Sequence, residues 1–188
     1  MSLARRRRRV IGRVRARVWA MRWRGVTVGR RAVVGRWCRL VLEPGARLSI
    51  GDGCEVDDGT TLAVYGGATL DLGSSCFLGH HCTIASRRSV SIGRGTFLAE
   101  LVSVRDHDHD PAFPPSAGAT RVAPVTIGPD VWLASKVTVL KGSTIGGRAV
   151  IGAHALVRGE VPAGAVAVGA PARVVRHIGE QPVPERAG

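Results

Sequence analysis

The chain has 188 residues with 25 glycines and few aromatic side chains, a length that suits one domain with short appendages. Its formal net charge is +13 at pH 7, and it has no run of about 18 apolar residues, which argues against a membrane-spanning helix. The N-terminus lacks the uninterrupted apolar core of a signal peptide, so we expect a cytoplasmic protein rather than an exported one.

The positive charge is concentrated in the first part of the chain. Residues 1–42 hold 14 arginines and no acidic residue, whereas residues 43–188 hold 13 basic and 14 acidic residues, a balance of −1. Within residues 1–25, apolar side chains recur at helical spacing after an arginine run. They are Val10, Val14, Val18, Trp19, Met21 and Trp23. We therefore predict a basic amphipathic helix over this segment.

Three interpretations of residues 1–25 remain open. A basic amphipathic helix with tryptophans suits the surface of an anionic membrane, which would place the protein peripherally at the inner face of the cell membrane. Alternatively, the helix only covers the open first turn of the fold that follows, whose unpaired edge needs protection. The same charge would attract nucleic acid, but no base-reading motif is present, so we expect no nucleic-acid partner.

From Val28 onward the chain is built of six-residue units. Eighteen of them open with an aliphatic residue, and nine of these residues are followed directly by glycine. The openers are Val28, Val34, Leu40, Ile50, Val56, Leu62, Leu72, Leu78, Ile84, Ile92, Leu98, Val104, Ile127, Leu133, Val139, Ile145, Ile151 and Val157. Neither a helix nor a plain strand sustains a period of six, whereas a short strand followed by a tight corner does. We expect the aliphatic side chains inside and the glycines to free the backbone for the turn.

The units group in threes, with coils starting at positions 28, 50, 72, 92, 127 and 145. Where a coil is longer than three six-residue units, all of its additional residues follow the third unit. All insertions therefore lie on one edge of a three-sided prism, whose coils stack about 4.8 Å apart. The longest insertion, between Val104 and Ile127, predicts a protruding loop over residues 105–126.

The four cysteines share one place in the repeat. Cys38, Cys54, Cys76 and Cys82 each occupy the fifth position of a unit. We interpret them as small core residues rather than as a disulfide framework or a metal cluster.

The loop over residues 105–126 is the first candidate for chemistry, because a long excursion from a compact repeat is more often functional than idle. It begins Arg-Asp-His-Asp-His-Asp at 105–110. His107 and His109 thus lie among carboxylates that can orient an imidazole and raise its basicity. A solvated acidic loop without a function is the alternative interpretation.

Residues 124–176 carry the motifs of one enzyme group. They read Pro-Val-Thr-Ile-Gly-Pro-Asp-Val-Trp-Leu-Ala at 124–134, Gly-Ser-Thr-Ile-Gly at 142–146 and Val-Gly-Ala-Pro-Ala-Arg at 168–173. With the preceding histidine loop, this order resembles the hexapeptide-repeat O-acetyltransferases, the group of galactoside, maltose and polysaccharide acetyltransferases. The resemblance implies an all-β fold, a left-handed parallel β-helix of about six triangular coils, although right-handed crossovers are the general rule. We expect a basic helix in residues 1–25, the β-helix in 26–160 and a short tail in 161–188.

The resemblance also implies a catalytic mechanism. These enzymes use one loop histidine as general base at the cleft between subunits of a homotrimer. In the family that histidine lies five places after an aliphatic opener, and counting from Val104 gives His109. His107, three places after Val104, is the second candidate. A neutral imidazole would remove the proton of a sugar hydroxyl as its oxygen attacks an acetyl thioester.

The acyl donor implied by the resemblance is acetyl-CoA, lying along a prism edge beside the last coils. The positions that match the family's motif are Ala134 and Ser135 for the pantetheine arm, Ala153 for backbone contacts, and Arg173 and Arg176 for the nucleotide phosphates. A guanidinium group suits phosphate recognition. The two arginines could also belong to a basic tail that merely covers the last coil.

Two other functions are weighed against the acetyltransferase. A γ-type carbonic anhydrase uses the same prism with three histidines on zinc, and the candidates here are His81, His107, His109 and His154. The metal spacing of that family is missing, and the Gly-Ala-Pro-Ala-Arg tail argues against it. A catalytically silent β-helix scaffold is the second alternative, which an intact histidine loop disfavours. The identity of the sugar or sugar-containing acceptor stays open.

Overall fold

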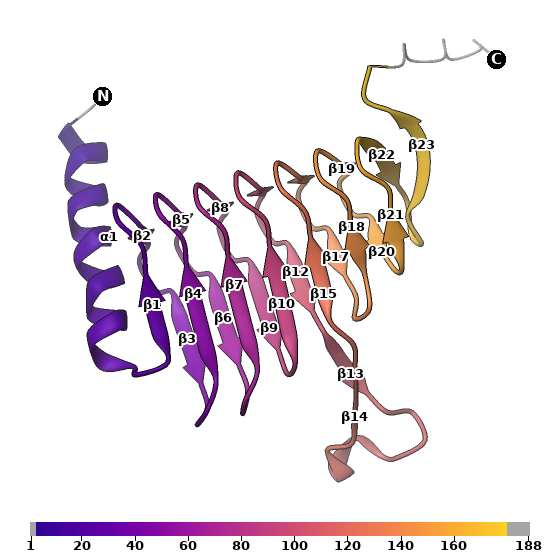
Figure 1. The fold of residues 1–188 in the computed structure, drawn as a ribbon, viewed down its shortest axis with the longest axis horizontal. Coiled ribbons are helices and arrows are strands. Elements are labelled where there is room, and N and C mark those ends of the chain that lie inside the picture. The colour runs from indigo at the N-terminus through magenta and orange to yellow at the C-terminus, as the bar shows by residue number, and fades with distance from the viewer. Residues whose placement is uncertain (1–2, 180–188) are drawn as a thin grey trace.

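The computed structural model describes residues 3–179 and consists of one helix followed by a prism of short strands (Figure 1). Three mostly parallel sheets form the three faces of a left-handed β-helix of about six coils, which confirms the predicted fold class. Among the described residues, no helix is both long enough and apolar enough to cross a membrane.

Each coil contributes one strand to each face. Sheet A contains β1 (Val26–Val28), β4 (Arg47–Ile50), β7 (Thr69–Leu72), β10 (Ser89–Ile92), β15 (Val125–Ile127), β18 (Thr144–Ile145) and β21 (Glu160–Val161). Sheet B contains β2 (Val33–Val34), β5 (Glu55–Val56), β8 (Phe77–Leu78), β11 (Phe97–Leu98), β16 (Trp132–Leu133), β19 (Val150–Ile151) and β22 (Ala165–Val168). Sheet C contains β3 (Arg39–Leu42), β6 (Thr61–Val64), β9 (Thr83–Ser86), β12 (Ser103–Arg105), β17 (Thr138–Val139) and β20 (Leu156–Val157). At the far end, β23 (Arg173–His177) pairs antiparallel with β22 and covers the edge of sheet B.

The predicted openers form continuous ladders inside the prism. In sheet A, Ile50 is in register with Leu72, Leu72 with Ile92, and Ile92 with Ile127. These four side chains are at most 2% exposed. Since a fully buried aliphatic side chain stabilises the fold by about 1.5–3 kcal/mol, the ladders provide most of the driving force for coil stacking.

The glycines that follow the openers have a different role from the expected one. None of these nine glycines has a positive φ; the left-handed residue of the corner comes two places later, as at Ser75 (φ 57°) and His81 (φ 57°). Instead, the glycines are required by the stacking of the coils. A Cβ built on Gly51 would lie 2.6 Å from the carbonyl carbon of Gly73, and one on Gly93 would lie 2.5 Å from that of Gly128. The expectation that they free the turn was wrong, because close approach of the next coil excludes a side chain there.

The residues in the fifth place of a unit link successive coils through their side chains. The thiols of Cys54, Cys76 and Cys82 donate to the carbonyls of Gly73, Gly93 and Ala99 at 2.8, 3.1 and 3.1 Å. The Thr60 and Thr96 hydroxyls do the same. The four cysteines are free, and all but the partly exposed Cys38 are buried, as predicted for core residues. A small donor at this place satisfies a corner carbonyl that faces the core.

All insertions lie at the corner between sheets C and A, which we call the C–A corner, and the predicted single edge is thereby confirmed. The longest insertion forms a hairpin of β13 (His107–His109) and β14 (Thr120–Val122), joined through the short 3-10 helix η1 (Pro115–Ala117). The hairpin projects from the side of the prism between β12 and β15 (Figure 1).

Helix α1 (Leu3–Arg22) lies across the open end of the first coil (Figure 1). Gly12 allows this contact, because a Cβ there would lie 2.5 Å from the Cγ1 atom of Val33. Ala16 is 1% exposed, and Trp19 and Trp23 pack against the core. The helix therefore covers the first coil, as one of the interpretations of residues 1–25 expected.

Candidate active site at the histidine hairpin

Asp106 anchors the base of the hairpin to the preceding coil through its carboxylate. Its side chain is fully buried at the C–A corner, where it accepts hydrogen bonds from the backbone amides of Arg87, Arg88 and Ser89 at 2.7–2.8 Å. The Ser86 hydroxyl lies 3.1 Å from the same carboxylate. Burial by itself would raise the pKa of Asp106, but the amide hydrogen bonds and the contact with His107 outweigh it and lower the pKa below its ordinary value. The carboxylate is thus ionised and held rigidly.

His107 is oriented by this carboxylate. Its Nδ1 atom lies 2.9 Å from Oδ1 of Asp106, and its side chain is 16% exposed. Because an ionised carboxylate only accepts hydrogen bonds, Nδ1 carries the proton, and the neutral ring therefore has an unprotonated Nε2. A buried carboxylate that sets the tautomer of a histidine is the arrangement found where an imidazole acts as general base.

Two further side chains surround the imidazole. The ring of Tyr65 meets that of His107 edge to face, with centroids 5.7 Å apart. The Arg87 guanidinium lies over the Tyr65 ring, 4.4 Å from its centroid. Tyr65 and Arg87 come from the two preceding coils, so the wall around His107 is built by stacking.

His109 lies farther out on the hairpin. Its side chain is exposed, and its backbone is in register with Thr120 on β14. The hairpin itself is held by ion pairs, with Lys141 2.8 Å from Asp108 and Arg121 2.9 Å from Asp110. The structure thus brings His107, and not His109, into contact with the buried carboxylate.

Asp106→Asn should lower the free energy of unfolding at about pH 7 by about 3 kcal/mol, because an amide nitrogen would face backbone amides that need an acceptor. The pKa of Asp106 is lowered on folding, so its contribution is present above the ordinary carboxyl pKa of about 3.9 and is lost as the pH falls through the folded-state pKa. The difference between variant and wild type should therefore shrink below about pH 4. Urea unfolding at matched protein concentration measures it, with Asp108→Asn as the control. If Asp106→Asn lowered the free energy of unfolding equally at about pH 7 and below about pH 4, the stabilising role assigned to the ionised carboxylate would be contradicted.

The positions matched to acetyl-CoA gather at another corner, between sheets B and C, which we call the B–C corner. Ala134 and Ser135 follow β16, and Ala153 follows β19 directly above them. The amide of His154 donates to the Ser135 carbonyl at 3.0 Å, which fixes the two turns together. Ala153 is exposed, so this row of the corner presents backbone with small side chains.

The two arginines lie on β23. Arg173 is in register with Val168 and Arg176 with Val166, and a register shift between Val166 and Ala167 puts an extra residue in β23. Residues three apart on a regular strand face opposite sides, but this bulge places both arginines on the outer face of sheet B. Arg173 lies at the B–C corner, whereas Arg176, whose partner is two residues earlier on β22, is about 7 Å farther along the strand.

Within one chain, His107 and the positions matched to acetyl-CoA lie at different corners of the prism. His107 follows the sheet C strand β12 at the C–A corner, and Ser135 precedes the sheet C strand β17 at the B–C corner. The imidazole and the positions matched to acetyl-CoA thus flank opposite edges of sheet C. Across the described residues, His, Cys, Asp and Glu side chains form no group of three able to hold a metal ion.

Sequence reasoning did not single out Asp106, Tyr65 or Arg87. An ionisable residue two places after the twelfth opener, Val104, was the available signal for Asp106, since that position turns inward at the corner. Tyr65 and Arg87 gave no local signal, because they reach His107 only through the stacking of different coils.

The sequence matches a family profile and is similar to several curated relatives. The profile of the bacterial transferase hexapeptide (six repeats) matches residues 124–159. A probable acetyltransferase of Mycobacterium tuberculosis is 38% identical over 135 residues, covering 70% of this chain and 45% of that protein. WbbJ of Escherichia coli K12, which carries the name putative lipopolysaccharide biosynthesis O-acetyl transferase, is 31% identical over 156 residues, covering 75% of this chain and 80% of WbbJ.

The fold is shared with solved acyltransferases at low sequence identity. AntD, an N-acyltransferase from Bacillus cereus solved with dTDP-4-amino-4,6-dideoxyglucose and coenzyme A, superposes with a TM-score of 0.69 at 16% identity over 80% of this chain and 82% of AntD. A hexapeptide-repeat acetyltransferase from Vibrio cholerae, solved with acetyl coenzyme A, has a TM-score of 0.56 at 22% identity over 83% and 72% of the chains. On the strength of the repeat profile and the similarity that spans most of WbbJ, the chain belongs to the hexapeptide-repeat acyltransferase family.

Proposed function

We propose that the protein is an acetyl-CoA-dependent O-acetyltransferase that acylates a hydroxyl of a sugar or sugar-containing acceptor. The observation that carries the proposal is the pair formed by His107 and Asp106, in which a buried, ionised carboxylate lies 2.9 Å from Nδ1 and leaves Nε2 as the nitrogen that can accept a proton. We assign the general base to His107 for this reason, with His109 as the alternative that the sequence motif favours.

The proposed reaction follows from the chemistry of this imidazole. Nε2 of His107 removes the proton of the acceptor hydroxyl as the hydroxyl oxygen attacks the thioester carbonyl carbon. The C–S bond then breaks, and the imidazolium returns the proton to the departing sulfur, so that an ester and a thiol are formed. Asp106 stabilises the imidazolium between the two proton transfers, and such a base accelerates a reaction by about 10²–10⁴.

A base of this kind favours oxygen over nitrogen as the nucleophile. An alcohol is a weak nucleophile unless a base removes its proton during attack, whereas a neutral amine attacks without that help and loses its proton afterwards. WbbJ is named for O-acetyl transfer, which agrees with this choice. An acceptor panel that pairs each sugar with its amino analogue would separate the two reactions.

The B–C corner is suited to the acyl donor. Ala134, Ser135 and Ala153 form a row of small side chains at this corner, so an extended pantetheine arm could lie against the backbone there. Arg173 and Arg176 supply two exposed guanidinium groups on one face for phosphates.

We also propose a homotrimer, because a single chain separates the base from the donor positions by the width of sheet C. A neighbouring prism that presents its B–C corner to the C–A corner of the first would complete the site, and cyclic symmetry would repeat it three times. Light scattering should give a mass near three times that of the chain. A stable monomer with full activity would contradict this arrangement.

The protein is further proposed to be cytoplasmic, with peripheral contact to an anionic membrane through residues 1–25. The concentration of 14 arginines without an acidic residue in residues 1–42 supports this contact.

A thiol-release assay tests the central proposal. The purified protein would be supplied with acetyl-CoA and a panel of sugars, glycosides and amino sugars, and free thiol would be followed with a chromogenic reagent. Release that depends on a hydroxyl acceptor supports the proposal. Release only with amino sugars would make the enzyme an N-acetyltransferase, and no release with any acceptor would favour the scaffold alternative.

A further inference from the structure

Helix α1 has two apolar faces, and only one of them is used by the prism. Gly12, Ala16, Trp19 and Trp23 recur at spacings of three and four and face the first coil. Gly12 and Ala16 let the helix lie close against the strands, and Trp19 and Trp23, the second just beyond the end of α1, pack against the core. The side of α1 turned away from the prism is different in character.

The outer face carries a row of exposed aliphatic side chains, which we call the outer stripe. It consists of Val10, Val14, Val18 and Met21, whose side chains are exposed by 54%, 57%, 43% and 79%. Helical spacing puts these residues opposite the buried Gly12 and Ala16 faces. Contiguous exposed apolar surface of this kind on a protein marks an interaction site rather than a solvated face.

Arginines border the outer stripe on both sides. Arg13 and Arg17 follow one border and Arg22 the other, and all three are exposed. An apolar stripe between rows of arginine is the pattern of a helix that lies in the interface of an anionic bilayer, where its aliphatic side chains enter the acyl region.

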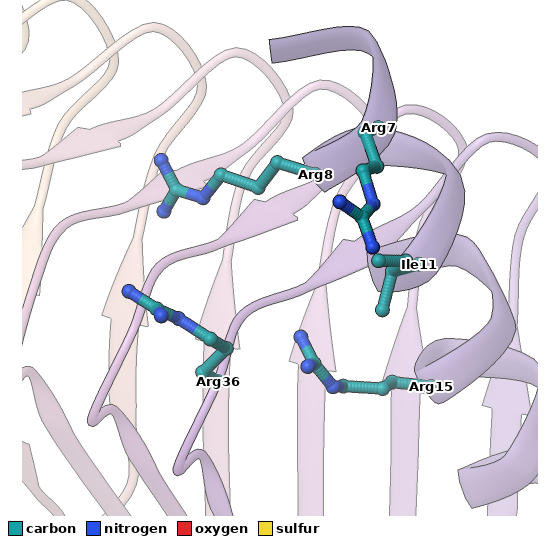
Figure 2. Close-up of a pocket in the computed structure, with 5 residues that line it drawn as sticks. All are labelled: Arg7, Arg8, Ile11, Arg15 and Arg36. Carbon is teal, nitrogen blue, oxygen red and sulfur yellow. The ribbon is translucent and has the colours of Figure 1, made fainter. Parts of the chain in front are cut away.

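A pocket of about 430 Å³ adjoins the stripe, between α1 and the B–C corner of the first coil. Arg7, Arg8, Arg15 and Arg36 line it together with Ile11, and Figure 2 shows Arg36 on the coil beside the helix that carries the other four residues.

Two of the arginines in this pocket have carboxylate partners. Arg8 pairs with Asp57, and Arg36 lies 3.2 Å from Asp58. Within the described part of the chain, Arg7 and Arg15 have no such partner, so the pocket keeps a net positive charge.

An exposed tryptophan completes this corner. Trp37 follows Arg36, is 77% exposed, and has the Arg36 guanidinium 4.6 Å from its ring centroid. Indole rings are enriched at the headgroup level of membranes because they combine an apolar body with a polar N–H group.

We infer that α1 docks the prism end-on to an anionic bilayer, with the outer stripe in the interface and the phosphate of an anionic lipid headgroup in the pocket of Arg7, Arg8, Arg15 and Arg36. The inference deepens the membrane contact proposed above, on which it rests, by naming the face, the lipid chemistry and the orientation. A second copy of the chain is a poor occupant of the stripe. Two such helices face to face would oppose their arginine rows, and residues 1–42 contain no acidic residue to compensate them.

The test uses the full chain and vesicles of phosphatidylcholine alone or mixed with phosphatidylglycerol. Wild type should sediment with the mixed vesicles and much less with the neutral ones. Val14→Ser/Met21→Ser keeps the charge and should weaken binding to mixed vesicles at least tenfold. Arg7→Gln/Arg15→Gln should also weaken it about tenfold.

The matched control for charge is Arg94→Gln/Arg148→Gln, which removes two exposed arginines from distant coils and should change binding by less than about twofold. Thermal unfolding and coenzyme A affinity should be unchanged in all three variants, which separates a failure of docking from a failure of the proposed transferase. All the substituted residues lie outside the His107 site and the B–C corner of the last coils.

Several outcomes would overturn the inference. Equal binding to both kinds of vesicle, or an equal loss in the Arg94/Arg148 variant, would remove the specific role of the pocket. Saturable binding of glycerol phosphate to the wild-type pocket without vesicle binding would make it a site for a free phosphate. A dimer of trimers that Val14→Ser/Met21→Ser dissociates would identify a second copy as the occupant of the stripe.

Discussion

His107→Ala should lower kcat by about two to four orders of magnitude and leave the affinity for acetyl-CoA nearly unchanged, because it removes the group that takes the hydroxyl proton. The Asp106 carboxylate, already held by three amides, would keep its place and preserve the hairpin. Added imidazole should restore part of the activity by occupying the vacated space. Steady-state kinetics with a responsive acceptor measure the loss, and calorimetry measures acetyl-CoA binding.

His109→Ala is the matched control, since it removes an imidazole two residues away on the same strand. It should change kcat by less than about tenfold and act mainly on the Michaelis constant of the acceptor. The opposite pattern would give the role of base to His109, as counting from Val104 predicted. Rates near wild type in both single variants and in the double variant would remove the hairpin from the mechanism.

The second large effect is expected from mixing two inactive variants. Ala153→Trp should abolish activity by placing an indole on the B–C corner, where the donor is proposed to lie. If His107 of one subunit works with the B–C corner of its neighbour, co-expressed His107→Ala and Ala153→Trp subunits should regain about a quarter of wild-type activity, since one in four interfaces in random trimers is intact.

Different affinity tags on the two variants allow mixed trimers to be isolated, and each variant alone serves as the control. Mixed trimers without activity would show that the base and the donor positions belong to the same subunit. Activity above that of either variant alone would require a shared site, because neither chain carries both intact halves.

The repeating unit made most of the fold predictable. A chain with a buried aliphatic residue every six positions can stack its coils in one way, as a three-sided prism. The ladder from Ile50 to Ile127 and the single edge for insertions could therefore be predicted from the spacing. The role of the glycines did not follow, because spacing describes the path of one coil, whereas Gly51 and Gly93 are constrained by the coil above.

The choice between His107 and His109 shows the same limit at the candidate site. Both residues alternate with aspartates, so the local pattern treats them alike. Only the amides of Arg87, Arg88 and Ser89, from an earlier coil, distinguish Asp106 from Asp108 and hence the imidazole that is held. Helix α1 is a related case: capping the first coil and contacting a membrane were treated as alternatives, yet the helix has a separate face available for each.

The regular rise of the coils has a consequence for the size of the acceptor. With α1 lying on a bilayer, the prism stands upright, and His107 follows the fourth strand of sheet C, counted from the helix. Three coil spacings and the thickness of the helix place the imidazole about 25 Å above the lipid. The prism would then act as a ruler: it would favour acceptors whose sugars extend that far from their anchor, and a prism with one coil fewer below the site would have a reach shorter by about 5 Å.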